Sequence, residues 1–115
     1  MTVPDPVVRW EINSRDPAAQ QKFFGTVFGW TTTVIDQESG YGLVDTGGTP
    51  GGIGPEPHYG TRIYVEVDDI AAALARARAA GATYTQGPAD LGGFTLGVFD
   101  DPEGNRIGLV QRSGH

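Results

Sequence analysis

The sequence predicts an α+β fold in which two tandem βαβββ modules form one half-barrel domain. The first observation is an internal repeat, because the two halves of the chain align at an offset of 52 or 53 residues. The second is that each half carries one helix pattern among several strand patterns. The third is size, since 115 residues make one compact domain and half of them are too few to bury a good core. The aligned pairs include Arg9 with Arg62, Asp16 with Asp68, Gly29 with Gly81, and Gly40 with Gly92.

We expect a single domain over residues 1–115, with modules at 6–54 and 60–112. A stretch rich in glycine and proline, residues 47–60, would join them.

The first module opens with an alternating strand over 6–13. Its apolar face carries Val8, Trp10 and Ile12, and its polar face carries Arg9, Glu11 and Asn13. Ser14 or Asp16 caps the following helix, Pro17 suits its first turn and Gly29 ends it. The helix should bury an apolar stripe formed by Ala19, Phe23 and Val27, with Phe24 and Phe28 beside it. A hairpin over 30–36 and 41–46 and a short strand near 52–53 complete the module.

The second module repeats this order. Its first strand, 61–67, points Ile63, Val65 and Val67 one way and Arg62, Tyr64 and Glu66 the other. Asp68 or Asp69 caps a helix over 70–80 whose inner stripe is Ile70, Ala73, Leu74 and Ala77, and Gly81 ends it. Strands are expected at 82–86, 93–99 and 105–111, with a turn over 101–105 before the last.

Composition excludes several functional classes. There is no cysteine, so neither a disulfide nor a thiolate metal site is expected. The net charge of −6 argues against a nucleic acid or an anionic membrane as partner. We see no signal-peptide pattern and no run of membrane-spanning length, and therefore expect a cytoplasmic protein.

Several motifs together resemble the vicinal oxygen chelate superfamily, which includes glyoxalase I, bleomycin-resistance proteins and extradiol dioxygenases. The resemblance covers nearly the whole chain. Its motifs are the Phe23–Phe24 pair, the helix end Phe28–Trp30, the helix entry Val67–Asp69 and the run from Phe99 to Leu109. It implies that each module curls its sheet around a ligand, with helices on the outer side, and that the protein is a homodimer.

The resemblance also implies where a metal would bind in the enzymes of this superfamily. The ligand positions on the first strand of each module fall on Arg9 and Arg62. Those on the last strands fall on Gly52 or Ile53 and on Gly108. Arginine stays protonated and offers no lone pair, and glycine has no side chain, so we expect no metal and no other cofactor.

The residues that replace the metal ligands have two interpretations. Arg9 and Arg62, facing each other across one cavity, would receive a carboxylate, phosphate or phenolate through bidentate hydrogen bonds. Alternatively, the two arginines pair with Glu11 and Glu66 in an internal polar network. Tyr64 would stack on a ligand, and His58, in the linker, would act as an acid or base near neutral pH. The candidate ligand-binding residues are thus Arg9, Glu11, His58, Arg62, Tyr64 and Glu66.

The function that these residues favour is binding of a small, anionic organic molecule in the cleft between the modules, without a metal and without an assigned catalytic residue. Two alternatives stay open. The protein is an enzyme of the same superfamily, either with a metal recruited by a non-standard route or moving a proton through Glu11 or Glu66. Otherwise it is a structural or partner-binding domain with a filled cavity.

Overall fold

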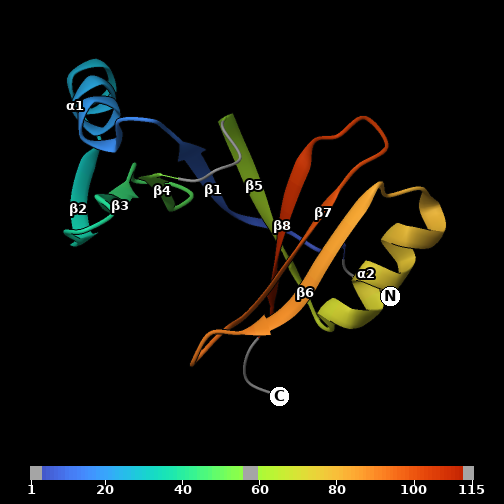
Figure 1. The fold of residues 1–115 in the computed structure, drawn as a ribbon. Helices are drawn as coiled ribbons and strands as arrows, with labels where there is room; N and C mark the ends of the chain where they lie inside the picture. The colour runs from blue at the N-terminus through green and yellow to red at the C-terminus, as the bar shows by residue number, and fades with distance from the viewer. Residues whose placement is uncertain (1–3, 56–59, 113–115) are drawn as a thin grey trace. The chain divides into compact units, whose positions relative to one another are not determined.

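The computed structural model describes residues 4–55 and 60–112 (Figure 1). The chain divides into two compact units. Residues 9–62 make up the first unit, and the residues before Arg9 together with those after Arg62 make up the second. Each unit contains one helix and most of the strands of one predicted module. The boundaries fall inside two strands, and each of these strands is described with the unit that holds most of its residues.

The first unit has the element order β1 (Val7–Asn13), α1 (Pro17–Phe28), β2 (Thr31–Asp36), β3 (Tyr41–Asp45) and β4 (Gly51–Gly54). Its strands lie in the order β2-β3-β4-β1. β1 runs parallel to β4, and the other two pairs are antiparallel. The short strand predicted near Gly52 is therefore present, as the partner of the first strand.

The second unit repeats this arrangement with β5 (Gly60–Val67), α2 (Ile70–Ala80), β6 (Tyr84–Asp90), β7 (Thr95–Asp100) and β8 (Arg106–Gln111). Its strands lie in the order β5-β8-β7-β6, with β5 parallel to β8. Two copies of βαβββ confirm the predicted α+β class.

The helix ends follow the sequence signals. The Asp16 carboxylate accepts a hydrogen bond from the Ala19 amide at 3.2 Å, and Asp69 does the same for the Ala72 amide. Gly29 and Gly81 end the two helices with φ of 74° and 114°, a left-handed conformation that glycine adopts without steric cost.

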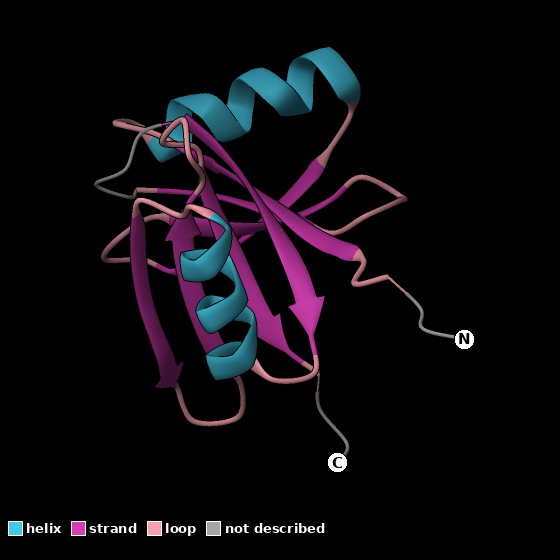
Figure 2. Ribbon diagram, turned by 90° about the vertical axis from the view of Figure 1, so that its right-hand side faces the viewer, coloured by secondary structure: helices cyan, strands magenta, loops and turns pink. Residues whose placement is uncertain are grey.

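Helix α2 covers one face of its sheet, as Figure 2 shows for the helix nearest the viewer. The core between them consists of Val67, Ile70, Leu74 and Leu109. Ile70 and Leu74 are one helical turn apart, so both reach the sheet, as the predicted stripe requires. Gly97 of β7 allows this close approach, because a Cβ there would lie 2.7 Å from Cγ2 of Ile70.

Helix α1 differs from its predicted packing, since none of its residues is buried. Phe23 and Val27, expected on the inner stripe, are 56% and 51% exposed. The helix meets its sheet through Gln21, whose amide donates to the carbonyl oxygens of Gly40 and Ile53. Phe24 stacks on Trp30, which in turn contacts Trp10 of β1. These contacts set the rotation of the helix and leave Phe23 and Val27 pointing outward.

Strand β6 also differs from the prediction, because it spans 84–90 rather than 82–86. Its pairing with β7 shifts between Gln86 and Ala89, which marks a β-bulge. Pro88 lies at this irregularity on the outermost strand of the second-unit sheet, where a missing N–H is tolerated. The glycine and proline therefore bend the strand without ending it.

In the part of the chain that the structure describes, the helices are too short and too polar to cross a lipid bilayer.

Candidate ligand-binding site

The polar face of β1 lies opposite α1, as the alternation predicted. Trp10 points toward the helix end, where it contacts Trp30, and its neighbours Arg9 and Glu11 point to the other face. Glu11 is paired with Gly52 of β4 and is only 8% exposed. A carboxylate this deeply buried requires hydrogen-bond donors around it.

Tyr41 joins the two charged residues of this face. Nη2 of Arg9 donates a hydrogen bond to the Tyr41 hydroxyl, and that hydroxyl donates to Oε2 of Glu11 at 2.8 Å. We call Arg9, Tyr41 and Glu11 the first-unit polar chain. It brings together two residues that the sequence predicted for ligand binding and one, Tyr41, that it did not.

The surroundings of Tyr41 keep its hydroxyl protonated. Burial raises the pKa of Tyr41 above its ordinary value of 10.0, and the negative charge of Glu11 adds to the rise, while Arg9 opposes it to a smaller extent. The hydroxyl thus serves as a fixed donor to Glu11 and as an acceptor for Arg9 over the whole physiological pH range.

This raised pKa predicts a pH dependence of stability. Above pH 10 the unfolded chain releases the Tyr41 proton while the folded protein retains it, so the free energy of unfolding should fall as pH rises past 10. Urea unfolding at about pH 8, 10 and 11, values that bracket the ordinary pKa of tyrosine, measures how the free energy of unfolding changes with pH. Tyr41→Phe should lose part of that dependence; an identical pH dependence in both proteins would contradict the assignment.

Glycines on β4 make room for the Tyr41 ring. A Cβ on Gly52 would lie 2.1 Å from the Tyr41 hydroxyl oxygen and 2.8 Å from Nη2 of Arg9. A Cβ on Gly54 would lie 2.3 Å from the same ring. The first-unit polar chain therefore occupies the space that a side chain on β4 would need.

The second unit shows the same exchange of side chain for glycine. Tyr64 of β5 is buried and paired with Gly108 of β8. A Cβ on Gly108 would lie 2.3 Å from the Tyr64 ring. Arg62, two residues before Tyr64, is also buried. Tyr64 thus packs over the glycine at a predicted metal-ligand position, and its ring fills the space of the absent side chain.

Glu66 is engaged at the far end of β5. Its carboxylate accepts a hydrogen bond from Nε of Arg112 at 3.1 Å, and Nη1 of Arg112 also contacts Asp68 at 2.5 Å. The hydrogen bonds that Arg112 donates to Glu66 and Asp68 raise its pKa further above the ordinary value. Arg112, which no sequence motif indicated, is therefore a partner of Glu66 within the second unit.

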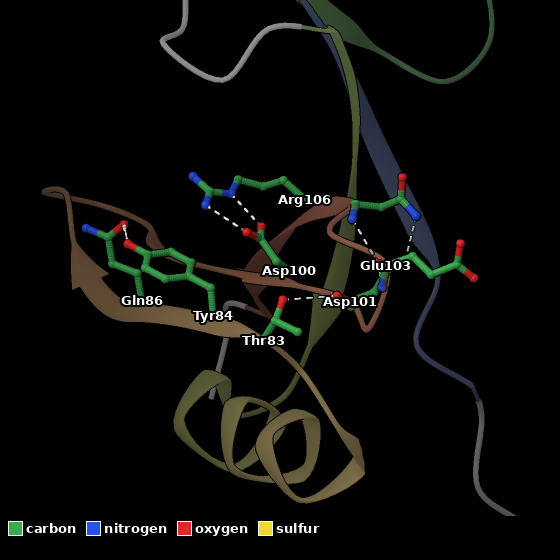
Figure 3. A network of polar contacts seen from close by, with 8 residues as sticks. Thr83, Tyr84, Gln86, Asp100, Asp101, Glu103 and Arg106 are labelled. Atoms are coloured by element: carbon green, nitrogen blue, oxygen red, sulfur yellow. Dashed lines mark hydrogen bonds and ion pairs between the residues drawn. The ribbon is translucent and has the colours of Figure 1, made fainter.

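A second polar group lies across three strands of the same unit (Figure 3). Tyr84, Asp100 and Arg106 are in register on β6, β7 and β8. Arg106 binds Asp100 through two hydrogen bonds of 2.8 and 3.1 Å, and its guanidinium lies 4.7 Å from the centre of the Tyr84 ring. The Tyr84 hydroxyl donates to Oε1 of Gln86 at 3.0 Å. These four residues form a second-unit polar row on the face opposite α2, and no motif in the sequence pointed to it.

The residues at the predicted metal positions do not fit a divalent metal. Arg9 and Arg62 are cations, and Gly52 and Gly108 lie beneath tyrosine side chains that would have to move before any ligand could be placed there. Across residues 4–55 and 60–112, no three side chains of His, Asp or Glu gather closely enough to hold a metal ion. The described side chains of this site offer guanidinium, phenol and carboxylate groups.

Two expectations about the site stay predictions. His58 lies outside the described residues. The facing of Arg9 and Arg62 across one cavity is likewise a prediction of the internal repeat.

Comparison with known proteins identifies the fold. A glyoxalase/bleomycin resistance protein/dioxygenase superfamily member from Vibrio splendidus 12B01 aligns over 95% of this chain and 100% of its own, with a TM-score of 0.71 and 16% identity. The methylmalonyl-CoA epimerase of Mycobacterium tuberculosis aligns over 99% of this chain and 94% of its own, with a TM-score of 0.60 and 15% identity. An NAD-dependent benzaldehyde dehydrogenase from Legionella pneumophila aligns over 96% and 100%, with a TM-score of 0.60 and 17% identity.

No curated protein sequence matches the chain. The family model of the glyoxalase-like domain matches residues 9–110, which is most of the sequence. The repeated βαβββ order, the strand pairing within each unit and this match lead to one conclusion: the protein belongs to the family of glyoxalase-like domains.

Proposed function

We propose that this glyoxalase-like protein binds a small organic anion without a metal, with Arg9 as the main anion-binding residue. The observation that supports the proposal is the first-unit polar chain, in which Tyr41 holds the guanidinium of Arg9. Arg9 is also a position at which the superfamily resemblance implies a metal ligand. A guanidinium carries five N–H donors in a planar fork that matches a carboxylate.

The position of Tyr41 supports a binding role for Arg9. The contact with the Tyr41 hydroxyl fixes one nitrogen of the guanidinium, so less side-chain entropy is lost when a ligand binds. Arg9 is half-buried, which strengthens a hydrogen bond to an anion while leaving the side chain within reach of solvent. We also propose Arg62 and Tyr64 as ligand-binding residues. The homodimer implied by the superfamily resemblance is likewise part of the proposal.

The rival function is a structural one, and the same contacts favour it. Arg9, Tyr41 and Glu11 already satisfy part of one another's hydrogen-bonding capacity, as expected of an internal polar network. The two functions differ in what the removal of Arg9 changes: a binding residue affects ligand affinity, whereas a purely structural residue affects stability alone.

Titration calorimetry with benzoate distinguishes the anion-binding function from the structural one. Benzoate should bind the wild-type protein, and its neutral analogue benzamide should bind more weakly, because only the carboxylate pairs with the guanidinium. Arg9→Ala should weaken benzoate binding by about tenfold or more, equivalent to about 1.4 kcal/mol.

Arg76→Ala is the matched control, because Arg76 is an exposed arginine on α2. It should leave benzoate affinity unchanged. Equal benzoate affinity in wild type and in a folded Arg9→Ala variant, or no binding of benzoate at all, would favour the structural network and overturn the proposal.

A further inference from the structure

We propose that the second unit contains a separate pocket for a neutral six-membered ring that carries an oxygen. The pocket lies between β6 and β7 and has a volume of about 130 Å³. Its lining residues are Gln86, Gly87, Ala89, Leu96, Gly97 and Val98. None of them belongs to the anion-binding proposal for Arg9, so this inference stands independently of it.

The pocket exists because of the β-bulge in β6. The pairing between β6 and β7 is interrupted between Gln86 and Ala89, which separates the side chains of the two strands. Gly87 has φ of 111°, and a Cβ there would lie 2.9 Å from the Cα of Gly97. Gly87 therefore lets the bulged strand pass close to β7, and backbone without a side chain forms part of the pocket wall.

The inner wall of the pocket is apolar. A Cβ on Gly97 would point toward Ile70 and Leu74 of α2, so its neighbours Leu96 and Val98 project to the opposite face. Leu96 is paired with Ala89, and Val98 with Gln86. An aliphatic wall of this kind favours a ring or another compact apolar group.

One edge of the pocket carries a hydrogen-bond donor with a fixed direction. The Tyr84 hydroxyl donates to the carbonyl oxygen of Gln86, and Figure 3 shows the two side chains side by side on the face opposite α2. Because the carbonyl is engaged, Gln86 presents its amide N–H groups to a partner. The matching ligand group is an oxygen acceptor.

The adjacent charges favour a neutral ligand. Arg106 lies next to this edge but is held by both oxygens of Asp100 and by the face of Tyr84. The pair is neutral overall and leaves no net positive charge to attract an anion. This distinguishes the pocket chemically from Arg9.

Size sets the class of ligand. An apolar cavity of about 150 Å³ is large enough to bind benzene. The pocket between β6 and β7 is slightly smaller and widely open to solvent, so it would take one face of a single ring and let a polar substituent reach Gln86. A neutral phenol meets every one of these requirements.

Fluorine NMR with 4-fluorophenol tests the inference at pH 7, where a phenol is neutral (its pKa is about 10). Wild type should broaden and shift the fluorine signal in a saturable way. Ala89→Leu, which fills the hollow from the exposed edge strand, should weaken binding by about tenfold or more. Ala71→Leu, the same change on the exposed side of α2, should not.

Two further arms make the result specific. Gln86→Leu should weaken 4-fluorophenol but not fluorobenzene, because only the phenol has an oxygen for the amide. Ala89→Leu should leave benzoate binding intact, and Arg9→Ala should leave 4-fluorophenol binding intact. No saturable binding of 4-fluorophenol to wild type, or equal binding to a folded Ala89→Leu variant, would overturn the pocket assignment and leave the anion-binding proposal untouched.

Discussion

Gly108→Glu, which puts a carboxylate at one of the metal-ligand positions implied by the resemblance, is expected to lower the free energy of unfolding by about 3 kcal/mol or more. A Cβ on Gly108 would lie 2.3 Å from the buried Tyr64 ring, so the ring or the strand must move. Overpacking of this kind costs about 1–3 kcal/mol, and burying a carboxylate without a prepared partner adds to it. Urea unfolding measures the change.

Two companion variants show whether the Tyr64 ring is responsible. Gly48→Glu makes the same substitution at an exposed loop position, where a Cβ would lie at an ordinary contact distance of 3.7 Å from Oγ1 of Thr46. It should change stability by less than about 0.5 kcal/mol. Combining Gly108→Glu with Tyr64→Ala should recover part of the loss, because the smaller side chain vacates the space. Should Gly108→Glu prove as stable as wild type, Tyr64 does not hold the position that the structure gives it.

Leu74→Ala is expected to lower the free energy of unfolding by about 2–5 kcal/mol, because it removes a side chain from a packed core. Leu74 is 1% exposed and lies between α2 and its sheet with Val67, Ile70 and Leu109. Denaturant unfolding of the variant gives the cost directly.

Leu91→Ala provides the control, since Leu91 is 54% exposed at the turn between β6 and β7. Leu91→Ala should change the free energy of unfolding by no more than about 0.5 kcal/mol. A similar cost for both leucines would mean that α2 is not packed on its sheet as described.

Much of the fold could be predicted from local signals. Asp16 and Gly29 bound α1, Asp69 and Gly81 bound α2, and each acts through atoms within one helical turn. The alternation of β1 also placed Arg9 and Glu11 on a common face, because side chains of a strand alternate whatever it pairs with.

The partners of these residues could not be predicted in the same way. Tyr41 reaches Arg9 and Glu11 only because β3 lies beside β4, and β4 beside β1. Its ring also needs the missing side chains of Gly52 and Gly54, a requirement that no sequence pattern announces. Arg112 likewise contacts Glu66, 46 residues away in the sequence, only because the fold brings the two residues together.

The outward rotation of α1 had a different cause. An apolar stripe indicates which residues can be buried, and it does not say what they meet. The two hydrogen bonds of Gln21 and the stacking of Phe24 on Trp30 fix the helix in another orientation. Polar anchoring therefore outweighed the stripe in this unit, whereas Ile70 and Leu74 followed it in the other.

The most direct test of the central claim is the benzoate titration carried out with a chelator present throughout, and repeated with added zinc. If a guanidinium has replaced the metal as the anion-binding group, benzoate binds with the same affinity in the presence and in the absence of the chelator. Added zinc then leaves that affinity unchanged. Binding of benzoate that disappears with the chelator and returns with zinc would contradict the account.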